Sequence, residues 1–177
     1  MQARGMLMIE HRLIERMIAQ IRDALERIGA GERIDPAFVD TAVDFIRVYA
    51  DRTHHGKEED ILFRDLEGRS LSDEDDRLMR ELIDEHAFGR MTTKALVEAN
   101  DRYRNGEDGA LVHVADHLKA LVDFYPKHIE KEDKTFFPAS REYISDAEDA
   151  EMIQAFQDFD RKMIHERYEA IIERLEG

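Results

Sequence analysis

A histidine and a glutamate four residues apart, His128 and Glu132, continue an apolar stripe in the second half of the chain. The stripe advances in alternating steps of three and four residues through Leu111, Val114, Leu118, Leu121 and Tyr125. On a helix this spacing places the imidazole and the carboxylate on the face that is turned toward the core. Burying two polar groups without partners is costly, and a metal ion is one partner that would satisfy both.

The same pattern occurs earlier in the chain, where His54 precedes Glu58 by four residues. Both copies read His-x-x-x-Glu-[Glu/Asp]-x-x-[Leu/Phe]-Phe, and each lies downstream of a Glu-His dipeptide. The two dipeptides are Glu10-His11 and Glu85-His86. The lone histidine precedes the paired one by 43 residues in the first half and by 42 in the second. We infer two similar halves, each of which supplies one lone histidine and one histidine–glutamate pair.

Two imidazoles and one carboxylate per half form a ligand set that is associated with non-haem Fe(II) sites, which keep positions open for oxygen species. Two facing halves would hold two metal ions, with Glu58 and Glu132 placed to bridge them. Imidazole also suits zinc, copper and nickel, and carboxylate suits manganese, so iron is an inference from the set. Ferritin-like proteins use Glu-x-x-His and more glutamates. The nitrogen-rich set here favours binding of small ligands over strongly oxidising chemistry.

The composition narrows the function classes. The formal net charge of −15 argues against partners such as nucleic acid or an anionic membrane. The chain has no cysteine, so any metal must be held by nitrogen and oxygen. No apolar run is long enough for a membrane span, and the N-terminus lacks the hydrophobic region of a signal peptide. We therefore expect a cytoplasmic location.

The pattern predicts an all-α fold with four long helices and a fifth. The expected helices cover about residues 6–28, 35–68, 72–105, 109–134 and 146–176, and Pro138 is expected to end the fourth segment. Asp35-Pro36, the acidic run after Ser72 and the capping box Ser145–Glu148 are the start signals. We predict one domain over residues 1–177, with an up-down-up-down bundle over about 6–138 and a C-terminal helix over about 146–176.

Antiparallel packing would bring the four histidines together. His11 lies near the start of its helix, His54 toward the end of the second, His86 in the first half of the third, and His128 near the end of the fourth. In alternating order, the starts of the first and third helices share one end of the bundle with the finishes of the second and fourth. All four imidazoles should therefore lie at one depth and point inward.

The paired His-x-x-x-Glu motifs, the Glu-His dipeptides and the run His-His-Gly-Lys-Glu-Glu-Asp-Ile-Leu-Phe resemble the hemerythrin-like, or HHE cation-binding, domain. The resemblance covers roughly residues 6–138, and a four-helix bundle is the fold of that family. It implies a centre of two iron ions, oxo- or hydroxo-bridged, that binds dioxygen, nitric oxide or a related species. Manganese and zinc are the alternative metals. The implied metal ligands are His11, His54, Glu58, His86, His128 and Glu132.

One departure from the family concerns the third helix. Oxygen-carrying hemerythrins place a second histidine one turn from the first, whereas Leu82 and Arg90 flank His86 at four residues. Either His55 or a water would fill the gap, and His55 is the additional candidate ligand. The departure weakens the interpretation as a simple oxygen carrier. It favours a sensor, a peroxide-handling or an iron-handling role.

Several neighbouring features have structural explanations as well. His55 lies about 100° around a helix from His54, where it could pair with Glu59 on the flank. Gly56 inside a helix would relieve crowding, accommodate a local bulge or be a tolerated accident. His113 and His117, four residues apart, could form a second site, but a solvated face is the simpler interpretation. His165 is expected at the surface or in packing.

The sequence leaves two function classes. The first is a di-iron protein that binds or senses dioxygen, nitric oxide or peroxide, and the alternative is storage, delivery or homeostasis of iron or another metal without gas chemistry. A sensor would also need a signalling protein, and a delivery protein a metal acceptor. No general acid or base stands out beyond the ligands, so binding is favoured over catalysis, with oxygen- or peroxide-dependent activity left open.

Overall fold

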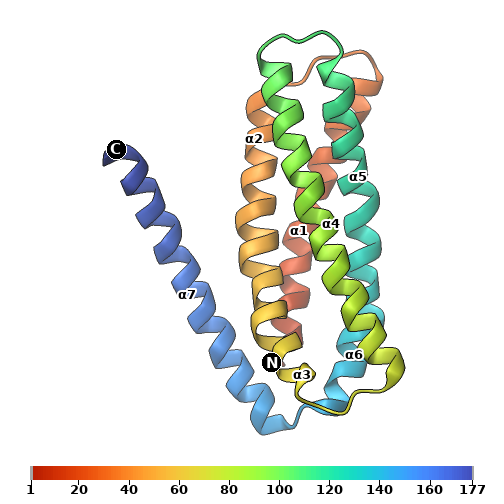
Figure 1. Cartoon of the computed structure of the whole chain (residues 1–177), viewed down its shortest axis with the longest axis vertical. Coiled ribbons are helices and arrows are strands. Elements are labelled where there is room, and N and C mark those ends of the chain that lie inside the picture. The colour runs from red at the N-terminus through yellow and green to blue at the C-terminus, as the bar shows by residue number, and fades with distance from the viewer. Residues whose placement is uncertain (1, 177) are drawn as a thin grey trace.

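The chain folds as an antiparallel bundle of four long helical rods with a fifth helix beside it (Figure 1). The computed structural model describes residues 2–176, and in α7 it describes the side chains up to Ile164 and that of Arg167. His165, expected at the surface or in packing, falls outside the described side chains. Within the described residues there is no strand. The predicted all-α, up-down-up-down bundle with a C-terminal helix is confirmed.

Two of the rods are single α-helices and two are composite. The first and third rods are α1 (Ala3–Gly29) and α4 (Asp73–Arg104). The second rod joins α2 (Pro36–Phe45), η1 (Ile46–His55), η2 (Glu58–Phe63) and α3 (Arg64–Glu67). The fourth joins α5 (Ala110–Lys131), η3 (Glu132–Phe136), α6 (Phe137–Ser140) and η4 (Arg141–Tyr143). The fifth helix is α7 (Asp146–Glu176).

The predicted helix starts are formed by side-chain caps. Asp35 accepts a hydrogen bond from the backbone N–H of Ala37 at 2.9 Å. Ser72 caps α4 by accepting from the N–H of Asp75 at 3.1 Å. At the start of α7, Ser145 N–H donates to the Glu148 carboxylate at 2.8 Å, and the N–H of Glu148 donates to the Ser145 hydroxyl at 3.3 Å. These bonds satisfy backbone donors that the first helical turn leaves without partners.

Two predicted boundaries are wrong. The first helix begins at Ala3 rather than near residue 6, because the Ala3 N–H donates to the carboxylate of Asp149 in α7 at 3.1 Å. This cap comes from 146 residues away, so local sequence does not reveal it. Pro138 does not end the fourth rod. It occupies the first turn of α6, where a missing N–H is tolerated, and the helical path continues to Tyr143.

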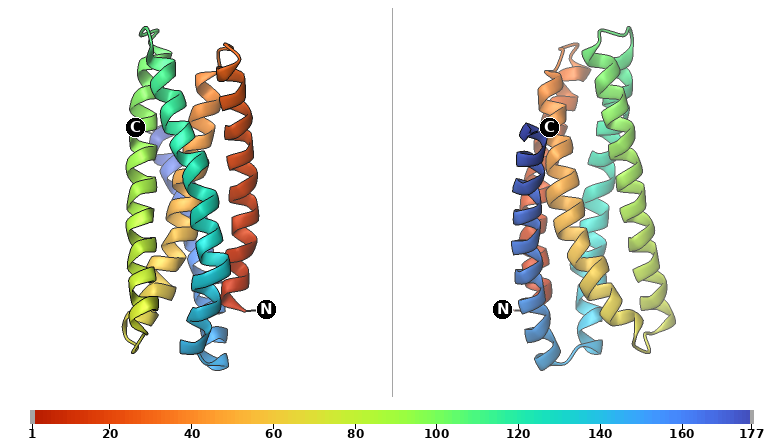
Figure 2. Two further views of the ribbon diagram at one scale, coloured as in Figure 1. Left: turned by 90° about the vertical axis from the view of Figure 1, so that its right-hand side faces the viewer. Right: turned by 60° about the vertical axis from the view of Figure 1, so that its left-hand side comes forward.

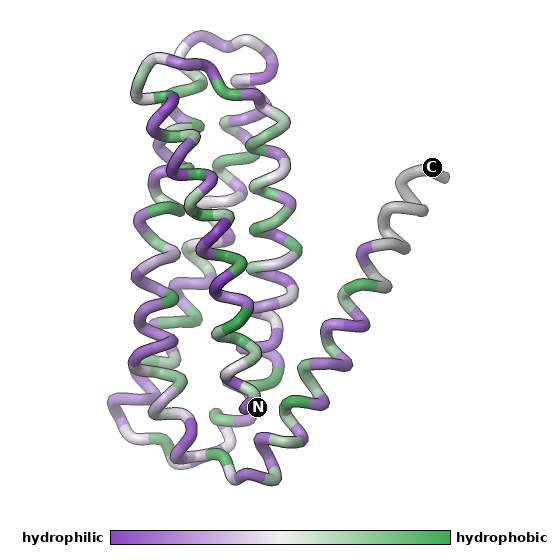
Figure 3. The backbone as a smooth tube through the Cα atoms, turned by 180° about the vertical axis from the view of Figure 1, so that it is seen from behind, coloured by the Kyte–Doolittle hydropathy of each residue, from purple (hydrophilic) through white to green (hydrophobic). Residues whose placement is uncertain are grey.

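The apolar core has two clusters, one on each side of the level at which the four histidines lie. The larger cluster fills the part of the bundle toward the loops 30–35 and 105–109, and it includes Ile18, Val39, Leu96, Leu118 and Tyr125. The smaller fills the other end and includes Leu7, Phe63, Leu82, Phe136 and Phe156. Hydrophobic and hydrophilic residues alternate along every rod in Figure 3, as expected for helices that bury one face.

The fifth helix packs against only one side of the bundle. It starts at the end where α3 and α6 lie and runs back along the side formed by α1 and the second rod (Figures 1 and 2). Its most extensive contacts are with α1, η1 and η2. Among the described residues, α4 and α5 make no comparable contact with α7.

Candidate metal centre

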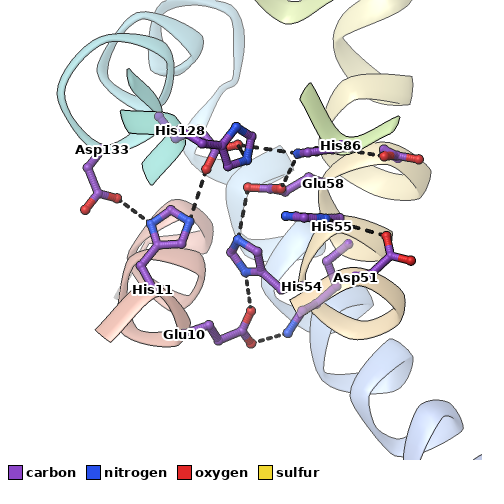
Figure 4. A network of polar contacts seen from close by, with 12 residues as sticks. Glu10, His11, Asp51, His54, His55, Glu58, His86, His128 and Asp133 are labelled. Atoms are coloured by element: carbon purple, nitrogen blue, oxygen red, sulfur yellow. Dashed lines mark hydrogen bonds and ion pairs between the residues drawn. The ribbon is translucent and has the colours of Figure 1, made fainter. Parts of the chain in front are cut away.

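The seven residues singled out in the sequence come together in the middle of the bundle (Figure 4). His11, Glu58, His86 and Glu132 have no exposed surface, and His54, His55 and His128 are at most 2% exposed. Their potential donor atoms form two groups, in each of which all atoms lie within 4.8 Å of one another. One group contains His11, His54, Glu58 and Glu132, and the other contains His55, His86 and His128. The candidate donors thus meet at one depth of the bundle, as antiparallel packing of the helices predicts.

Buried polar atoms without partners make this cluster the candidate cation site. Ten buried side-chain nitrogen and oxygen atoms of the described residues lack a hydrogen-bond partner, and nine of them belong to these seven residues. They include the Nε2 atoms of the four predicted histidines and all four oxygens of the two glutamates. Orphaned polar atoms in a protein core are costly and rare, and here they are gathered in one place. Imidazole nitrogens and carboxylate oxygens are donors that suit a divalent cation.

The two glutamates lie between the histidines of both groups. Glu58 is 3.5 Å from His54 Nε2 and 3.4 Å from His86 Nε2. Glu132 is 3.2 Å from the Nε2 atoms of both His11 and His128. Metal–ligand bonds of about 2.0–2.2 Å separate two ligands of one cation by roughly 3 Å. The donors are thus spaced for shared cations, and each carboxylate faces both groups.

Each of the four predicted histidines is held by a carboxylate at its outer nitrogen. Nδ1 of His11 lies 2.7 Å from Asp133, Nδ1 of His54 lies 2.9 Å from Glu10, Nδ1 of His86 lies 2.6 Å from Glu59, and Nδ1 of His128 lies 2.8 Å from Glu85. In every pair, the two partners come from different rods. A carboxylate at Nδ1 fixes the proton there and leaves the Nε2 lone pair pointing inward, which is how histidine ligands of metals are oriented.

These acidic residues belong to the duplicated sequence pattern, which predicts no partner for Glu10, Glu85 and Asp133 and suggests His55 rather than His86 for Glu59. Glu10 and Glu85 are the first residues of the two Glu-His dipeptides, and Glu59 and Asp133 follow the two candidate bridging glutamates. The signal that could have found them was the duplication itself, because all four recur at equal places in both halves. Their pairing needed the tertiary structure, since each residue serves a histidine of a neighbouring rod.

His55 lies inside the site rather than on the flank. Its ring stacks on that of His86 with a centroid distance of 3.9 Å and an interplanar angle of 11°. The carboxylate of Asp51 lies 3.5 Å from its Nδ1, and the opposite edge of the ring points toward the centre (Figure 4). His55 therefore adds a fifth imidazole to the site. The suggested flank pairing with Glu59 is not formed, because Glu59 bonds His86 instead.

The π-helical segment η1 helps to explain how adjacent histidines both face the core. A π-helix closes its backbone bonds over five residues, so the turn is wider than in an α-helix and the inward face shifts along the sequence. Two further π segments begin at the bridging candidates, η2 at Glu58 and η3 at Glu132. Such segments are frequent at functional sites. The local bulge considered for Gly56 is thus present on both sides of it.

Arg90 lies one turn after His86 on α4 and makes two ion pairs beside the site. Its Nε donates to Asp51 at 2.7 Å, and its NH2 group donates to Glu59 at 2.7 Å. Asp51 lies beside His55, and Glu59 accepts from His86. The guanidinium therefore joins the carboxylates behind two stacked imidazoles.

The electrostatics of the cluster without a cation are unfavourable. Burial lowers the pKa values of His54 and His55 well below the ordinary value, which keeps both imidazoles neutral and able to donate a lone pair. Burial, and then the negative charge of Glu132, raises the pKa of Glu58 well above its ordinary range. Two buried carboxylates side by side cannot both ionise at low cost unless a positive charge lies between them. Burial lowers the pKa of His11, but hydrogen bonds to Asp133 and Glu132 outweigh it and raise this pKa to about 9, so a protonated His11 supplies part of that charge. A bound cation would supply it in full.

The other histidine pair does not form a second cluster. His113 is exposed and His117 is half-buried, and neither joins a potential metal-binding group among the described residues. The interpretation as a solvated face of α5 agrees with this placement.

A helical bundle with a buried, nitrogen-rich set of histidines and glutamates defines a class of cation-binding proteins. The model of the Hemerythrin HHE cation binding domain matches residues 3–140, and the chain belongs to this family. The match includes the four rods and all seven candidate residues. Metal binding is thus a property of the family as well as of the geometry.

Three curated relatives are similar over most of the chain. They are "Uncharacterized protein Rv1995" and "Uncharacterized protein MT2051" of Mycobacterium tuberculosis and "Uncharacterized protein Mb2018" of Mycobacterium bovis. Each is 23% identical over 171 residues, which covers 96% of this chain and 66% of the relative. The chain therefore spans slightly less than two thirds of the length of these proteins. No solved structure matches it.

Over the residues that the structure describes, no helix combines the length and the apolar character that crossing a bilayer requires.

Proposed function

We propose that this chain is a dinuclear non-haem iron protein that binds or senses a small ligand such as dioxygen, nitric oxide or peroxide. One observation supports it above all: eight buried donor atoms without partners, four imidazole nitrogens and four carboxylate oxygens, converge from four rods between two apolar clusters. Five imidazoles and two carboxylates provide enough donors for two cations, with coordination positions left over.

The division of the donors gives each residue a role in the proposal. His11 and His54 would hold one ion, and His55, His86 and His128 the other. Glu58 and Glu132 face both groups and would bridge the two ions. When bound in such a set, iron supplies an exchangeable position for oxygen species. The protein's own contribution is orientation of the imidazoles through the carboxylates at Nδ1.

Aromatic rings exclude water from the same region. Phe137 stacks on His11 with a centroid distance of 5.7 Å, and Phe63 stacks on His86 at 6.0 Å. Both phenylalanines are at most 1% exposed. An apolar wall lowers the local dielectric and controls what reaches a metal.

The size of the adjoining space supports a small ligand. A cavity of about 100 Å³ borders His55, Gly89, Thr93 and Tyr125, and the Asp51–Arg90 ion pair forms part of its wall. An engineered protein cavity of about 150 Å³ holds a benzene molecule, so this smaller space favours a small molecule over a bulky organic substrate. This is why we favour dioxygen, nitric oxide, peroxide or a similar species.

Burial distinguishes this proposal from metal storage or delivery. A delivery protein has to release its metal to an acceptor, whereas all seven candidate ligands are at most 2% exposed. This burial supports a retained cofactor. A mild chelator provides the check, since a retained cofactor should resist it for hours while a cargo metal should be lost within minutes.

The direct test is anaerobic loading with Fe²⁺, followed by addition of azide, nitric oxide or oxygen. We expect two iron ions per chain and a ligand-to-metal charge-transfer band in the near-ultraviolet to visible range. His128→Ala should lower the iron content, and His113→Ala, which removes an exposed histidine of the same helix, should not. A loaded protein that stays colourless with all three ligands would contradict the ligand-binding proposal. Iron content that is equal in both variants would contradict the site.

A further inference from the structure

A lysine without exposed surface lies directly behind the metal centre. Lys57 follows His54 by three residues and is 0% exposed, which is rare for a lysine that is not fully paired. Its ammonium group donates to the carboxylate of Glu10, and it donates to Asp160 of α7 at 2.7 Å. Glu10 in turn accepts the hydrogen bond from His54 Nδ1 at 2.9 Å. An unbroken polar chain thus leads from α7 to a candidate ligand.

The second half contains the same arrangement without α7. Lys131 follows His128 by three residues and donates to Glu85, the carboxylate that holds His128. Its other partner is Glu81 of α4, whose side chain is 54% exposed. Lys131 itself is 23% exposed. The two halves therefore share the lysine and its carboxylate, and they differ in what lies behind the lysine.

Close packing fixes α7 at this point. A Cβ atom built on Gly56 would lie 2.8 Å from the ring of Phe159, so only glycine lets α7 approach this closely. Phe156 is fully buried, and its ring lies 5.9 Å from the Lys57 ammonium nitrogen. Gly56 and Lys57 are the two residues between η1 and η2. The fifth helix is thus packed against the junction of the two π segments that carry His54, His55 and Glu58.

Beyond this contact, α7 is less tightly packed. A groove of about 590 Å³ separates it from α1 and the second rod, lined by apolar residues such as Met17, Phe45 and Met163 and bordered by Asp160. Of the ion pairs that α7 makes with the bundle along this groove, the one formed by Asp160 is buried at the lysine, whereas that between Arg167 and Asp44 is largely exposed. Asp160 is therefore the residue of α7 whose replacement should change cation binding at the metal centre.

We propose that α7 is energetically coupled to the metal centre, with Asp160 and Lys57 acting as positioning residues for His54. Without Asp160, the buried ammonium would have only Glu10 as a carboxylate partner. Glu10 contacts Lys57 through one oxygen and His54 through the other, so a stronger pull from the lysine would draw it away from His54. Docking of α7 thereby strengthens cation binding at the group that contains His54. Because coupling is reciprocal, cation binding must hold α7 in place by the same factor. The inference rests on the proposed function. It means that the occupancy of the metal centre changes how firmly α7 is docked on the surface of the bundle.

The first test measures cation affinity. Wild-type protein and Asp160→Asn are titrated with Co²⁺ against a competing chelator, and the visible spectrum of bound Co²⁺ reports its coordination. We expect Asp160→Asn to lower the affinity for one of the two Co²⁺ ions by at least about fivefold, which is the lower end of typical coupling between two sites. Asp160→Glu, which keeps a carboxylate, should recover most of the loss. Asp158→Asn, an exposed neighbour on α7 that pairs with Arg161, is the matched control and should bind as wild type.

The second test measures the reciprocal effect. Amide hydrogen exchange over residues 152–163 is compared with and without Co²⁺. We expect exchange to slow on cation binding by at least about fivefold in the wild-type protein, and the change to be lost in Asp160→Asn. Glu81→Gln removes the equivalent carboxylate behind Lys131, and it should leave the exchange of α7 as in wild type. This comparison needs only the wild-type protein for its main result, so it holds even if Asp160→Asn folds poorly.

The outcomes separate this inference from the proposed function. Wild-type affinity in Asp160→Asn, or an exchange rate of α7 that Co²⁺ does not alter, overturns the coupling and leaves the metal centre intact. A wild-type chain that binds neither Co²⁺ nor Fe²⁺ overturns the proposed function, and the coupling with it.

Discussion

The two halves of the bundle contribute equivalent donors to the centre but surround them differently. The first half is α1 with the second rod, and the second half is α4 with the fourth rod. Around the centre each has a lone histidine, a His-x-x-x-Glu pair and two carboxylates that hold imidazoles of neighbouring rods. The positions that follow the paired histidine differ. His55, Gly56 and Lys57 in the first half correspond to Ile129, Glu130 and Lys131 in the second.

These differences fall in the rod against which α7 packs. His55 adds an imidazole where Ile129 adds apolar bulk, Gly56 admits Phe159, and Lys57 is buried by α7 where Lys131 stays partly exposed. A π segment, η1, precedes the paired histidine in the first half only, whereas α5 is α-helical up to Lys131. The comparison teaches that a duplicated site need not be a symmetric one. The candidate donors are alike in the two halves, whereas the residues behind them differ with the packing of α7.

The largest expected effect concerns the point at which the halves are equivalent. Glu58→Ala and Glu132→Ala should each lose at least one of the two ions, because each carboxylate faces both groups. Metal content per chain checks this. The loss should also remove ligand-linked stability, which amounts to about 4 kcal/mol for a cation present at a thousand times its dissociation constant. Normal metal content in only one of the two variants would show that the halves differ at the centre as well.

The next effect tests the two lysines. Lys57→Met leaves Glu10 and Asp160, whose side chains are 13% and 34% exposed, without their cation. The cost should lie between that of a surface pair and that of a fully buried one, which is about 3–5 kcal/mol. Lys131→Met breaks partly exposed pairs and should cost no more than about 1 kcal/mol. Urea unfolding of the metal-free proteins measures both. Equal losses would mean that cover by α7 does not distinguish the halves.

A smaller effect is expected from making the first half resemble the second. His55→Ile introduces the residue that the second half has at this position. It should lower the affinity for the ion at His86 and His128 by at least about tenfold, as the loss of a residue that supports a metal does. Ile129→Val, a modest change at the equivalent place, is the control. Affinity for Co²⁺ and its visible spectrum are the measurements. A His55→Ile variant that binds two ions as tightly as wild type would assign His55 to packing.

The smallest effect concerns the glycines. Gly56→Ala would push a methyl group against Phe159, and overpacking of this kind costs about 1–3 kcal/mol, offset in part by about 1 kcal/mol of helix propensity. Gly89→Ala, whose nearest neighbour is a Phe124 ring carbon at 3.4 Å, should stabilise by up to about 1 kcal/mol. Thermal unfolding of both variants shows whether each substitution stabilises or destabilises the protein. A stabilising Gly56→Ala would mean that α7 can shift without loss.

Much of the fold followed from local signals. The stripes of apolar residues, the caps at Asp35, Ser72 and Ser145, and the short connections predicted four rods and a fifth helix, because helix period and capping are properties of neighbouring residues. The start of α1 escaped prediction because its cap, Asp149, comes from the other end of the chain. The end at Pro138 failed because proline is tolerated in the first turn that follows a π segment.

The sequence by itself determined which donors exist and at what depth they meet, because helical spacing and antiparallel order fix the height and the face of each histidine. Only the tertiary structure decided which carboxylate holds which imidazole, whether His55 faces the core, and why Lys57 is buried. Those outcomes depend on contacts between rods and on the packing of α7 against Gly56. Such contacts join residues far apart in the chain, and no local pattern encodes them.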